Sequence, residues 1–359
     1  MNTSNQKYGP ITFLASNQKN LKKLTDEPWL QADTILIKPN WVSIEPAGFT
    51  SINTLKTIIE ALDSKIIVTE SFMLQRSMNL EKKGLPFNIM EKEVNWDWLL
   101  RGEGWSWLYD NPCWDWFKKE GHWDHILKED QYFLDTYGFT DLFQDYDVEY
   151  VNVTDEIWKG KSIDSEEIKT RTESRYNPVR VKRMYGFVPK KLYKYSGSTF
   201  ISLNRVQQYA TFSLKNMFGL IPDPMRSWWH GRNSSRIASS IVDINKIYNS
   251  IFNVLGMCAS IEKTAVKDPN GEYAAEYTGN YSIVDGFGFI TMSRDQVYLD
   301  STMLALTDEI AEYDQSTNVK PIQLAEKEGL GLFNREDRVD VKKKLGKWIV
   351  TNNSNNINR

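Results

Sequence analysis

The sequence predicts an α/β protein with a mostly parallel, twisted β-sheet flanked by helices, and three observations support this prediction. Short apolar runs that end in polar residues recur along the chain, as strands buried in a parallel sheet do. Two such runs enclose an amphipathic segment within residues 34–71, the pattern of a βαβ unit. The chain has 359 residues, 41% of them hydrophobic and 25% charged, which is ordinary for a globular protein of one large or two smaller domains.

We see no clean linker and therefore predict a single domain over residues 1–350. Two further parts complete the predicted organisation: a helical Trp-rich insertion at 73–137 and a disordered, Asn-rich tail at 351–359.

The βαβ unit opens with a predicted strand at Thr34–Ile37, which Pro39 and Asn40 end. The helix expected next, at Asn53–Leu62, has Thr50 or Ser51 as its N-cap, and the second strand is expected at Lys65–Val68. Ligands of parallel sheets bind beyond the carboxyl ends of the strands, so residues 38–40 and 70–71 are predicted at a binding edge.

The predicted insertion is distinguished by its tryptophans, because seven of the thirteen lie between Trp96 and Trp123. They recur in triplets every nine residues, and a step of nine residues would reverse the face of one continuous helix. We therefore expect short helical pieces joined by turns. These aromatic residues are expected to cap the main core, to form a lid over a substrate, or to make a docking face for a partner protein.

The same reasoning predicts the remaining elements. Strands are expected at 148–153, 199–203, 281–284 and 290–292, and helices at 141–146, 239–255 and 302–310.

Charge is unevenly distributed along the chain. Residues 175–242 contain twelve Lys and Arg but a single acid, Asp223, although the whole chain has a net charge of −3. Such a segment either concentrates positive potential on an anionic ligand or forms a surface whose charges pair with acids elsewhere. Nucleic acid is not expected as a partner, because the basic residues form no helical stripe and no nucleic-acid-binding motif is present.

Several classes of protein are excluded by missing motifs. The chain has no Gly-x-Gly-x-x-Gly, Walker A, Gly-x-Ser-x-Gly or His-Glu-x-x-His pattern, so the cofactor is left open. The two cysteines, Cys113 and Cys258, cannot form a disulfide framework or ligate a four-cysteine iron–sulfur cluster within this chain. The sequence has neither a secretory signal nor an apolar span, which predicts a cytoplasmic protein with no membrane partner.

Residues that could carry chemistry follow the apolar runs. A lysine beside an asparagine at a strand end or helix start suits a phosphate or carboxylate, and acids beside apolar runs suit proton transfer. A histidine among aromatic and basic residues is expected to have a lowered pKa and to act as a neutral base or donor. The candidate catalytic residues are Asp285, His230 and Asp243, and the candidate substrate-binding residues are Lys38, Asn40, Arg205, Lys215 and Asn216. We predict no metal site, because His122 and His125 lack a third ligand at a recognisable spacing.

Several of these segments together resemble the DUF362 family, a bacterial and archaeal family of unknown function. The segments that carry the resemblance are residues 35–40 (ILIKPN), 214–220 (LKNMFGL), 241–245 (IVDIN) with His230 before it, 283–286 (IVDG), 293–300 (SRDQVYLD) and 325–331 (AEKEGLG). The chain departs from the family pattern in three ways: it lacks the Lys-x-His before the Lys-Asn motif, the glycine-rich loop after Asp-Gly, and the cysteine-rich ferredoxin segments. The Trp-rich insertion is not part of that pattern either, and the resemblance supplies no reaction.

Two functions are consistent with these observations. The first is an enzyme of specialised metabolism that acts on a small anionic substrate by acid/base chemistry in a basic pocket under an aromatic lid. The second is a non-catalytic accessory protein that binds a ligand or a partner through the Trp-rich unit. The loss of the family's histidine and glycine-rich loop favours the second function.

Overall fold

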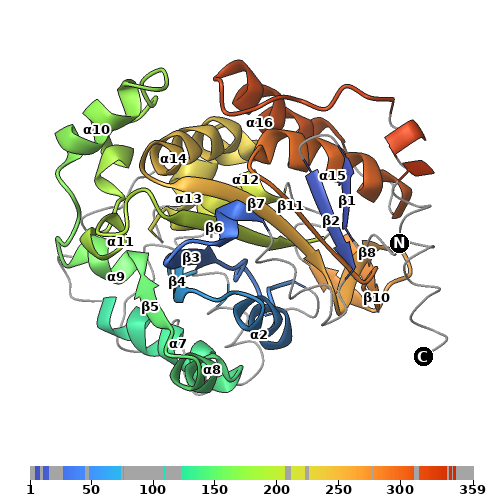
Figure 1. Cartoon of the computed structure of the whole chain (residues 1–359), viewed down its shortest axis with the longest axis horizontal. Helices are drawn as coiled ribbons and strands as arrows, with labels where there is room; N and C mark the ends of the chain where they lie inside the picture. The colour runs from blue at the N-terminus through green and yellow to red at the C-terminus, as the bar shows by residue number, and fades with distance from the viewer. Residues whose placement is uncertain are drawn as a thin grey trace.

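The chain forms an eight-stranded β-sheet with helices on both faces and a separate three-stranded sheet, which confirms the α/β prediction (Figure 1). The structure is a computed structural model. It describes residues 5–8, 11–15, 27–44, 48–73, 76, 109, 123–206, 212–222, 226–275, 279–310, 315–337, 339–341 and 343–344.

The large sheet has the order β1-β2-β11-β7-β6-β3-β4-β5. Its strands are β1 (Asn5–Tyr8), β2 (Ile11–Ala15), β3 (Thr34–Lys38), β4 (Lys65–Glu70), β5 (Glu149–Asn152), β6 (Thr199–Arg205), β7 (Asn253–Ser260) and β11 (Phe289–Ser293). The five strands from β5 to β7 pair in parallel, and the other three pair antiparallel. The predicted βαβ unit is confirmed, since β3 and β4 are parallel neighbours joined through α2 (Ile52–Glu60).

The order of the parallel strands creates a switch point between β3 and β6. From β3 the chain proceeds outward to β4 and β5, and then returns to the other side of β3 to form β6 and β7. In doubly wound sheets the crevice at such a switch point, beyond the carboxyl ends of the strands, is the usual ligand site. The residues that follow β3 and β6 therefore define the edge where a ligand is expected.

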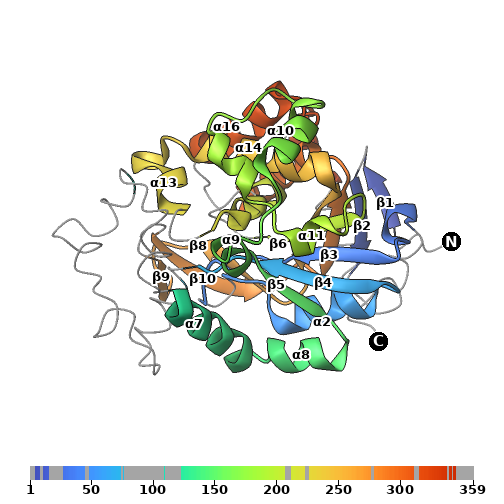
Figure 2. The ribbon, with the colours of Figure 1, turned by 90° about the vertical axis from the view of Figure 1, so that its left-hand side faces the viewer.

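Helices cover the two faces of the sheet in separate groups (Figures 1 and 2). One face carries α10 (Ser165–Glu173), α12 (Ser213–Asn216), α14 (Ile237–Ile251), α15 (Gln296–Ile310) and α16 (Gln315–Lys327). The other face carries α2, α7 (Trp123–Thr136) and α8 (Phe139–Asp145). Strand alternation serves both faces, because Leu36 packs in the first core while Ile35 and Ile37 pack in the second.

Two element boundaries differ from the sequence prediction. The helix expected at 239–255 ends at Ile251, and the chain then enters the central strand β7. Apolar residues continue at helical spacing through Leu255, so periodicity alone does not reveal this boundary. Cys258 consequently lies in β7, where burial raises the pKa of its thiol. The helix α15 begins at Gln296, ahead of the predicted start at residue 302, so Asp300 is helical.

The C-terminal part of the predicted insertion belongs to the main core. Phe133 of α7 is buried, and its ring centroid lies 5.5 Å from that of Trp41. The Trp triplets at 96–98, 105–107 and 114–116 lie outside the described residues, as do Cys113, His122 and the predicted tail at 351–359. Within the described part of the chain, no helix is long and apolar enough to cross a membrane.

The strand predicted at 281–284 is present as β10 (Gly279–Asp285) but belongs to the smaller sheet. It pairs antiparallel with β8 (Lys263–Lys267) and β9 (Tyr273–Ala275), so it does not bring Asp285 to the end of a parallel strand of the large sheet.

Candidate functional site

A buried ion pair occupies the carboxyl ends of β3 and β4. Lys38 is the last residue of β3 and only 1% exposed; its Nζ donates to Glu70 Oε2 at 2.8 Å and to Asn216 Oδ1 at 3.0 Å. Glu70 is the last residue of β4, and its Oε1 accepts a hydrogen bond from the backbone of Ser71 at 2.9 Å. Burial lowers the pKa of Lys38 to about 8, although the attraction of Glu70 opposes this effect.

The predicted asparagines join the strand ends to the following loops. Asn216 Nδ2 donates to the Lys38 carbonyl at 2.9 Å and to Ser202 Oγ at 3.1 Å, which ties α12 to β3 and β6. Asn40 Nδ2 donates to Asn204 Oδ1 at 2.9 Å across the switch point. The structure therefore brings Lys38, Asn40 and Asn216 together, as predicted, but these hydrogen bonds are made within the protein.

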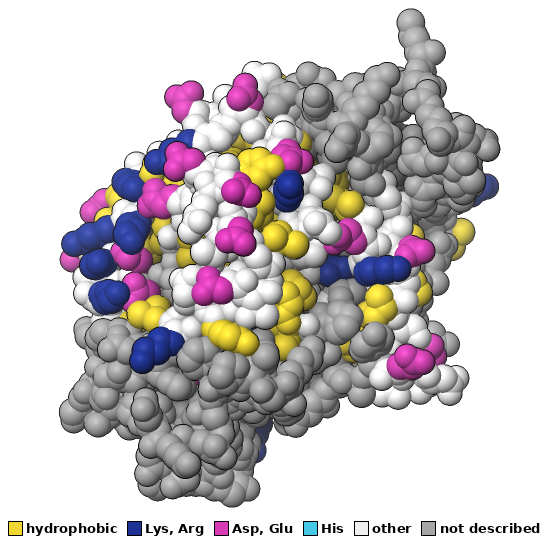
Figure 3. All heavy atoms as spheres, turned by 90° about the horizontal axis from the view of Figure 1, so that it is seen from below, with side chains coloured by type: hydrophobic (Ala, Val, Ile, Leu, Met, Phe, Trp, Pro, Cys, Tyr) yellow, Lys and Arg dark blue, Asp and Glu magenta, His cyan; other side chains and the backbone are white. Residues whose placement is uncertain are grey.

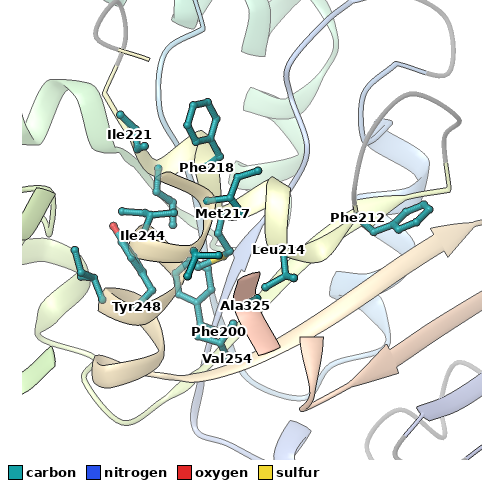
Figure 4. Packing of buried hydrophobic residues seen from close by; sticks show 14 of the residues in the cluster. Phe200, Phe212, Leu214, Met217, Phe218, Ile221, Ile244, Tyr248, Val254 and Ala325 are labelled. Atoms are coloured by element: carbon teal, nitrogen blue, oxygen red, sulfur yellow. The ribbon is translucent and has the colours of Figure 1, made fainter. Parts of the chain in front are cut away.

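The 3₁₀ turn η4 (Met217–Leu220) closes tightly over the ion pair. A Cβ atom at Gly219 would lie 2.6 Å from Lys38 Nζ and 2.9 Å from Glu70 Oε1, so only glycine fits without displacing the pair. Arg226, the first residue of α13 (Arg226–His230), stabilises this turn, because its guanidinium donates to the carbonyls of Gly219 at 3.0 Å and Ile221 at 3.2 Å. Figure 4 shows the apolar side of the same segment, with Leu214 and Met217 packed into the core.

Positive charge exceeds negative charge around this ion pair. Arg76 pairs with Asp130 and also donates to the Trp41 carbonyl at 3.1 Å. Arg226 hydrogen-bonds to carbonyls, the Ser71 hydroxyl and Met73, and no described carboxylate pairs with it. The charges of Arg76 and Arg226 both contribute to lowering the pKa of Lys38. Three buried cations thus face two buried carboxylates, Glu70 and Asp130, which favours a further anion nearby.

Lys215 is a desolvated lysine without a counterion in the described structure. It lies on α12, one residue before Asn216, and its side chain is partly buried. Burial lowers the pKa of Lys215 to about 8, and no opposite charge offsets this effect. No hydrogen bond or ion pair from its Nζ to any described residue is found, in contrast to Lys38. At pH 7 the amine is still largely protonated and can bind an anionic group.

His230 lies close enough to Lys215 for their charges to interact. Burial lowers the pKa of His230, and the positive charge of Lys215 lowers it further, so the imidazole is neutral at pH 7. Its Nδ1 lies 3.3 Å from the Gly231 carbonyl. Because a carbonyl can only accept, Nδ1 carries the proton and Nε2 keeps its lone pair. The pair thus combines a cation with a neutral base.

Tyr109 connects the Trp-rich segment to this pair. Its ring centroid lies 5.8 Å from that of His230, and its backbone carbonyl accepts a hydrogen bond from Arg236. Of residues 77–122, it is the one that the structure describes. Tyr109, which falls between the second and third Trp triplets in the sequence, therefore lies beside the histidine.

The other predicted site residues are placed elsewhere. Arg205 donates to the carbonyls of Phe49, at 2.6 Å, and Lys263, and so joins the loop before α2 to the small sheet. Asp285 is 88% exposed and pairs with Lys263, which lowers the pKa of its carboxyl group. Neither residue has a contact with Lys38, Lys215 or His230 among those that the structure describes.

Asp243 belongs to a buried ion network on α14. It accepts hydrogen bonds from Arg180 Nη1 at 2.6 Å and from Lys246 Nζ at 3.3 Å, and both cations also pair with Glu328. Burial raises the pKa of Asp243. The apolar neighbours of Asp243 correctly indicate that it is buried. Its cationic partners Arg180 and Lys246 also bind Glu328, so the network connects α14 to the residue that follows α16.

Several basic residues of the segment 175–242 pair with acids outside it. Lys191 Nζ lies 2.9 Å from Glu156 Oε1, and Lys194 Nζ lies 3.3 Å from Glu149 Oε1. Figure 3 shows Lys and Arg side chains intermixed with Asp and Glu over one part of the surface. The expectation of pairing with acids elsewhere therefore holds for these residues, whereas Lys215 has no partner among the described residues and the anionic ligand stays a prediction.

Sequence reasoning missed the buried residues that complete the site. Glu70 was noted as a strand end, and its role as the counterion of Lys38 was not predicted. Arg226 and Asp300 were not singled out, although both lie in or near motifs of the family resemblance. A charged residue within or close to an apolar run was the available signal for Glu70 and Asp300, whereas Arg226 follows Pro224 and Met225 and carries no such signal.

Two shallow hollows are described, and neither is lined by Lys215 or His230. One, of about 390 Å³, is lined by Trp29, Arg294, Asp295, Leu330 and Gly331; the other is lined by residues of α7, α8 and β5. Among the described residues, no group of three or more His, Cys, Asp or Glu could hold a metal ion.

The fold and this candidate site define a doubly wound α/β protein with a desolvated lysine and a neutral histidine in the segment that follows the parallel strand β6. The profile of the family described as "Domain of unknown function (DUF362)" matches residues 98–305. This match covers more than half of the 359 residues, so the chain belongs to the DUF362 family. The matched span includes Lys215, Asn216 and His230. No curated protein and no solved structure matches the chain.

Proposed function

We propose that the protein is a cytoplasmic enzyme that binds a small anionic substrate through Lys215 and uses Nε2 of His230 as a proton acceptor. The observation that carries this proposal is the state of Lys215, which is desolvated and has no anionic partner among the described residues. A protein gains nothing in stability by burying such a charge, so its presence favours a role in binding.

The surrounding charges support an anionic ligand. Lys38, Arg76 and Arg226 lie close together beneath α12, and the described carboxylates that pair with them, Glu70 and Asp130, are already neutralised by these cations. An anion at hydrogen-bonding distance from one lysine would gain about 4 kcal/mol at a dielectric typical of protein surfaces. A carboxylate or a phosphate meets this requirement, and both remain in the proposal.

The residues of the site would divide the work. Lys215 would hold the anionic group, and His230 would remove a proton from a neighbouring carbon, oxygen or nitrogen atom of the substrate. Lys38, Asn40 and Asn216 would form the rigid framework beneath, because their hydrogen bonds are used within the protein. Tyr109 beside His230 supports a covering role for the Trp-rich segment, which would exclude water from the proton transfer.

Native mass spectrometry of the purified protein would test binding. The wild type should carry a small anionic ligand that Lys215→Ala loses, while the variant keeps the circular dichroism spectrum and the cooperative unfolding of a folded protein. The matched control is Lys190→Ala, since Lys190 is an exposed lysine of the same basic segment. If Lys215→Ala keeps the ligand as fully as the control does, the assignment of Lys215 is wrong.

His230→Gln separates catalysis from binding. Glutamine keeps a polar side chain but cannot accept the proton, so the variant should retain ligand and accumulate unreacted substrate after exposure to a cell extract. The ligand recovered from it should then differ from the wild-type ligand in mass or, where the reaction is an isomerisation, in fragmentation pattern.

The accessory-protein function is kept as the second candidate for one structural reason. Asp243 and Asp285 are engaged in ion pairs, so His230 alone of the three predicted catalytic groups is available for proton transfer. On this alternative, the wild type and His230→Gln would carry the same ligand with the same mass.

A further inference from the structure

The helix that carries Lys215 is held by side chains from three other elements. α12 has only four residues, and such a short helix is not stable by itself. Ser202 of β6 donates to the Ser213 carbonyl at 2.8 Å, and Asn245 of α14 donates to the Leu214 carbonyl at 2.9 Å. The third contact comes from Asp300 of α15. Its carboxyl group accepts hydrogen bonds from the backbone N–H groups of Ser213 and Leu214, the same two residues whose carbonyls the other contacts bind.

Asp300 accepts three hydrogen bonds from α12. Its Oδ1 accepts from the backbone N–H of Ser213 at 2.9 Å and from Ser213 Oγ at 2.8 Å, and its Oδ2 accepts from the backbone N–H of Leu214 at 2.9 Å. The carboxyl group therefore occupies the place of an N-cap, although it comes from a residue 87 positions further along the chain. The side chain is completely buried.

This arrangement is costly for a structural cap. No described cation pairs with Asp300, and burial raises the pKa of its carboxyl group to about 7 in spite of the three donors. A serine or asparagine could cap a helix without burying a carboxylate. The carboxyl group adds orientation, because its two oxygens accept from both backbone donors of the first turn and from the Ser213 hydroxyl.

The influence of Asp300 on Lys215 is indirect. The lowered pKa of Lys215 is explained by burial alone, without an attraction from Asp300, so the two side chains do not form an ion pair. The hydroxyl group of Ser213 also lies against β7, because a Cβ atom at Gly256 would be 2.6 Å from Ser213 Oγ. Ser213 is thus fixed between β7 and Asp300, two residues ahead of the lysine.

We propose that Asp300 is a positioning residue that fixes α12 so that the ammonium group of Lys215 stays in its desolvated position at the ligand-binding edge. This inference rests on the proposed function for its importance to binding, but the position of Lys215 can be measured without any ligand. The variant Asp300→Asn keeps the shape of the side chain and removes its charge. It also replaces one of the two accepting oxygens by an N–H₂ group, which cannot accept a hydrogen bond from Ser213 or Leu214.

The test combines two measurements on the full chain. The first is the titration midpoint of Lys215, followed by NMR of ¹³Cε-labelled lysine and assigned by the signal that Lys215→Arg lacks. The second is the affinity for inorganic phosphate, measured by calorimetry. Asp300→Asn should move the Lys215 midpoint upward, toward that of an ordinary exposed lysine, and should weaken phosphate binding about tenfold or more.

The controls distinguish positioning from general damage. Asp295→Asn removes another partly buried carboxylate at the start of α15, one that accepts from the backbones of Tyr298 and Leu332 and whose described hydrogen bonds do not reach α12, so it should leave both readouts unchanged. Ser213→Ala removes one of the three hydrogen bonds and should produce a smaller change in the same direction. If Asp300→Asn does not fold, Ser213→Ala and Gly256→Ala carry the test.

The outcomes separate the two proposals. A wild-type midpoint and affinity in Asp300→Asn, or in both substitute variants, would overturn the positioning role. A shifted Lys215 midpoint in a protein whose wild type binds no phosphate would support the positioning role and count against the anion site.

Discussion

Replacing Lys215 by methionine should stabilise the protein while it removes the proposed ligand site. Methionine has nearly the shape of the lysine stem and no charge to desolvate. The pKa of Lys215 falls from 10.5 to about 8 on folding because of burial. At 1.36 kcal/mol per pKa unit, the cost of holding the charge in the folded state has a ceiling of about 3.4 kcal/mol. Because the side chain is partly exposed to water, we expect a gain of about 1–3 kcal/mol.

The pH dependence of this gain follows from the direction of the pKa shift. Below about pH 8 the lysine is charged in both states, and the folded chain bears the full cost. Between about pH 8 and pH 10.5 the folded chain loses the proton while the unfolded chain keeps it, so the cost declines to zero. The advantage of Lys215→Met should therefore be constant in acid and neutral solution and should disappear in alkaline solution.

Urea unfolding of the wild type and of Lys215→Met, each at about pH 7 and about pH 10, tests the gain in stability and its pH dependence. Both should be seen as shifts in the urea concentration at the unfolding midpoint, with an unchanged dependence of the free energy of unfolding on urea. Lys215→Arg is the matched control, since it keeps the charge and should not be stabilised. The reasoning is refuted if Lys215→Met is less stable than the wild type at neutral pH, or if its advantage is the same at both pH values.

Three further predictions concern the residues beneath and beside Lys215. Lys38→Met should have the opposite sign to Lys215→Met and destabilise by about 3–5 kcal/mol, because it leaves Glu70 buried without its cation; Lys38→Met combined with Glu70→Gln should recover a large part of this loss in urea unfolding. Gly219→Ala should lower stability by about 1–3 kcal/mol, since the new Cβ would displace the ion pair; an unchanged melting temperature would contradict the close approach. The pKa of Asp300 rises from 3.8 to about 7 on folding, so between these pH values the folded chain holds a proton that the unfolded chain has released. The stability of the wild type relative to Asp300→Asn should therefore decrease by about 1.4 kcal/mol per pH unit from about pH 4 to about pH 7, and a flat difference would show that Asp300 is not desolvated.

The part of the site that lies at strand ends could be predicted from the sequence. Parallel strands bring their carboxyl ends to one edge, so an apolar run followed by Lys38 and Asn40 predicts where those side chains lie. Asn216 is close to this edge because α12 follows β6 after a short connection. Local pattern and a single topological rule are sufficient for these three residues.

The placement of the two aspartates required information that local pattern does not contain. The apolar residues before Asp285 mark a strand but not the sheet to which it belongs, and β10 pairs in the smaller one. The apolar neighbours of Asp243 mark burial but not the partner, which comes from Arg180 and Glu328, far away in the sequence. In both cases the missing information is long-range pairing.

Lys38 and Lys215 show what distinguishes a framework lysine from a candidate ligand-binding lysine. Each lysine comes directly after an apolar residue and is followed within two residues by an asparagine. Burial lowers the pKa of both lysines to about 8. The difference is that Glu70 neutralises Lys38, whereas no described carboxylate neutralises Lys215. The number of basic residues in the segment 175–242 is therefore a poor guide to an anion site, because several of these residues are paired. A desolvated charge whose counterion is missing is the more specific sign, because an anionic ligand can supply what the folded chain does not.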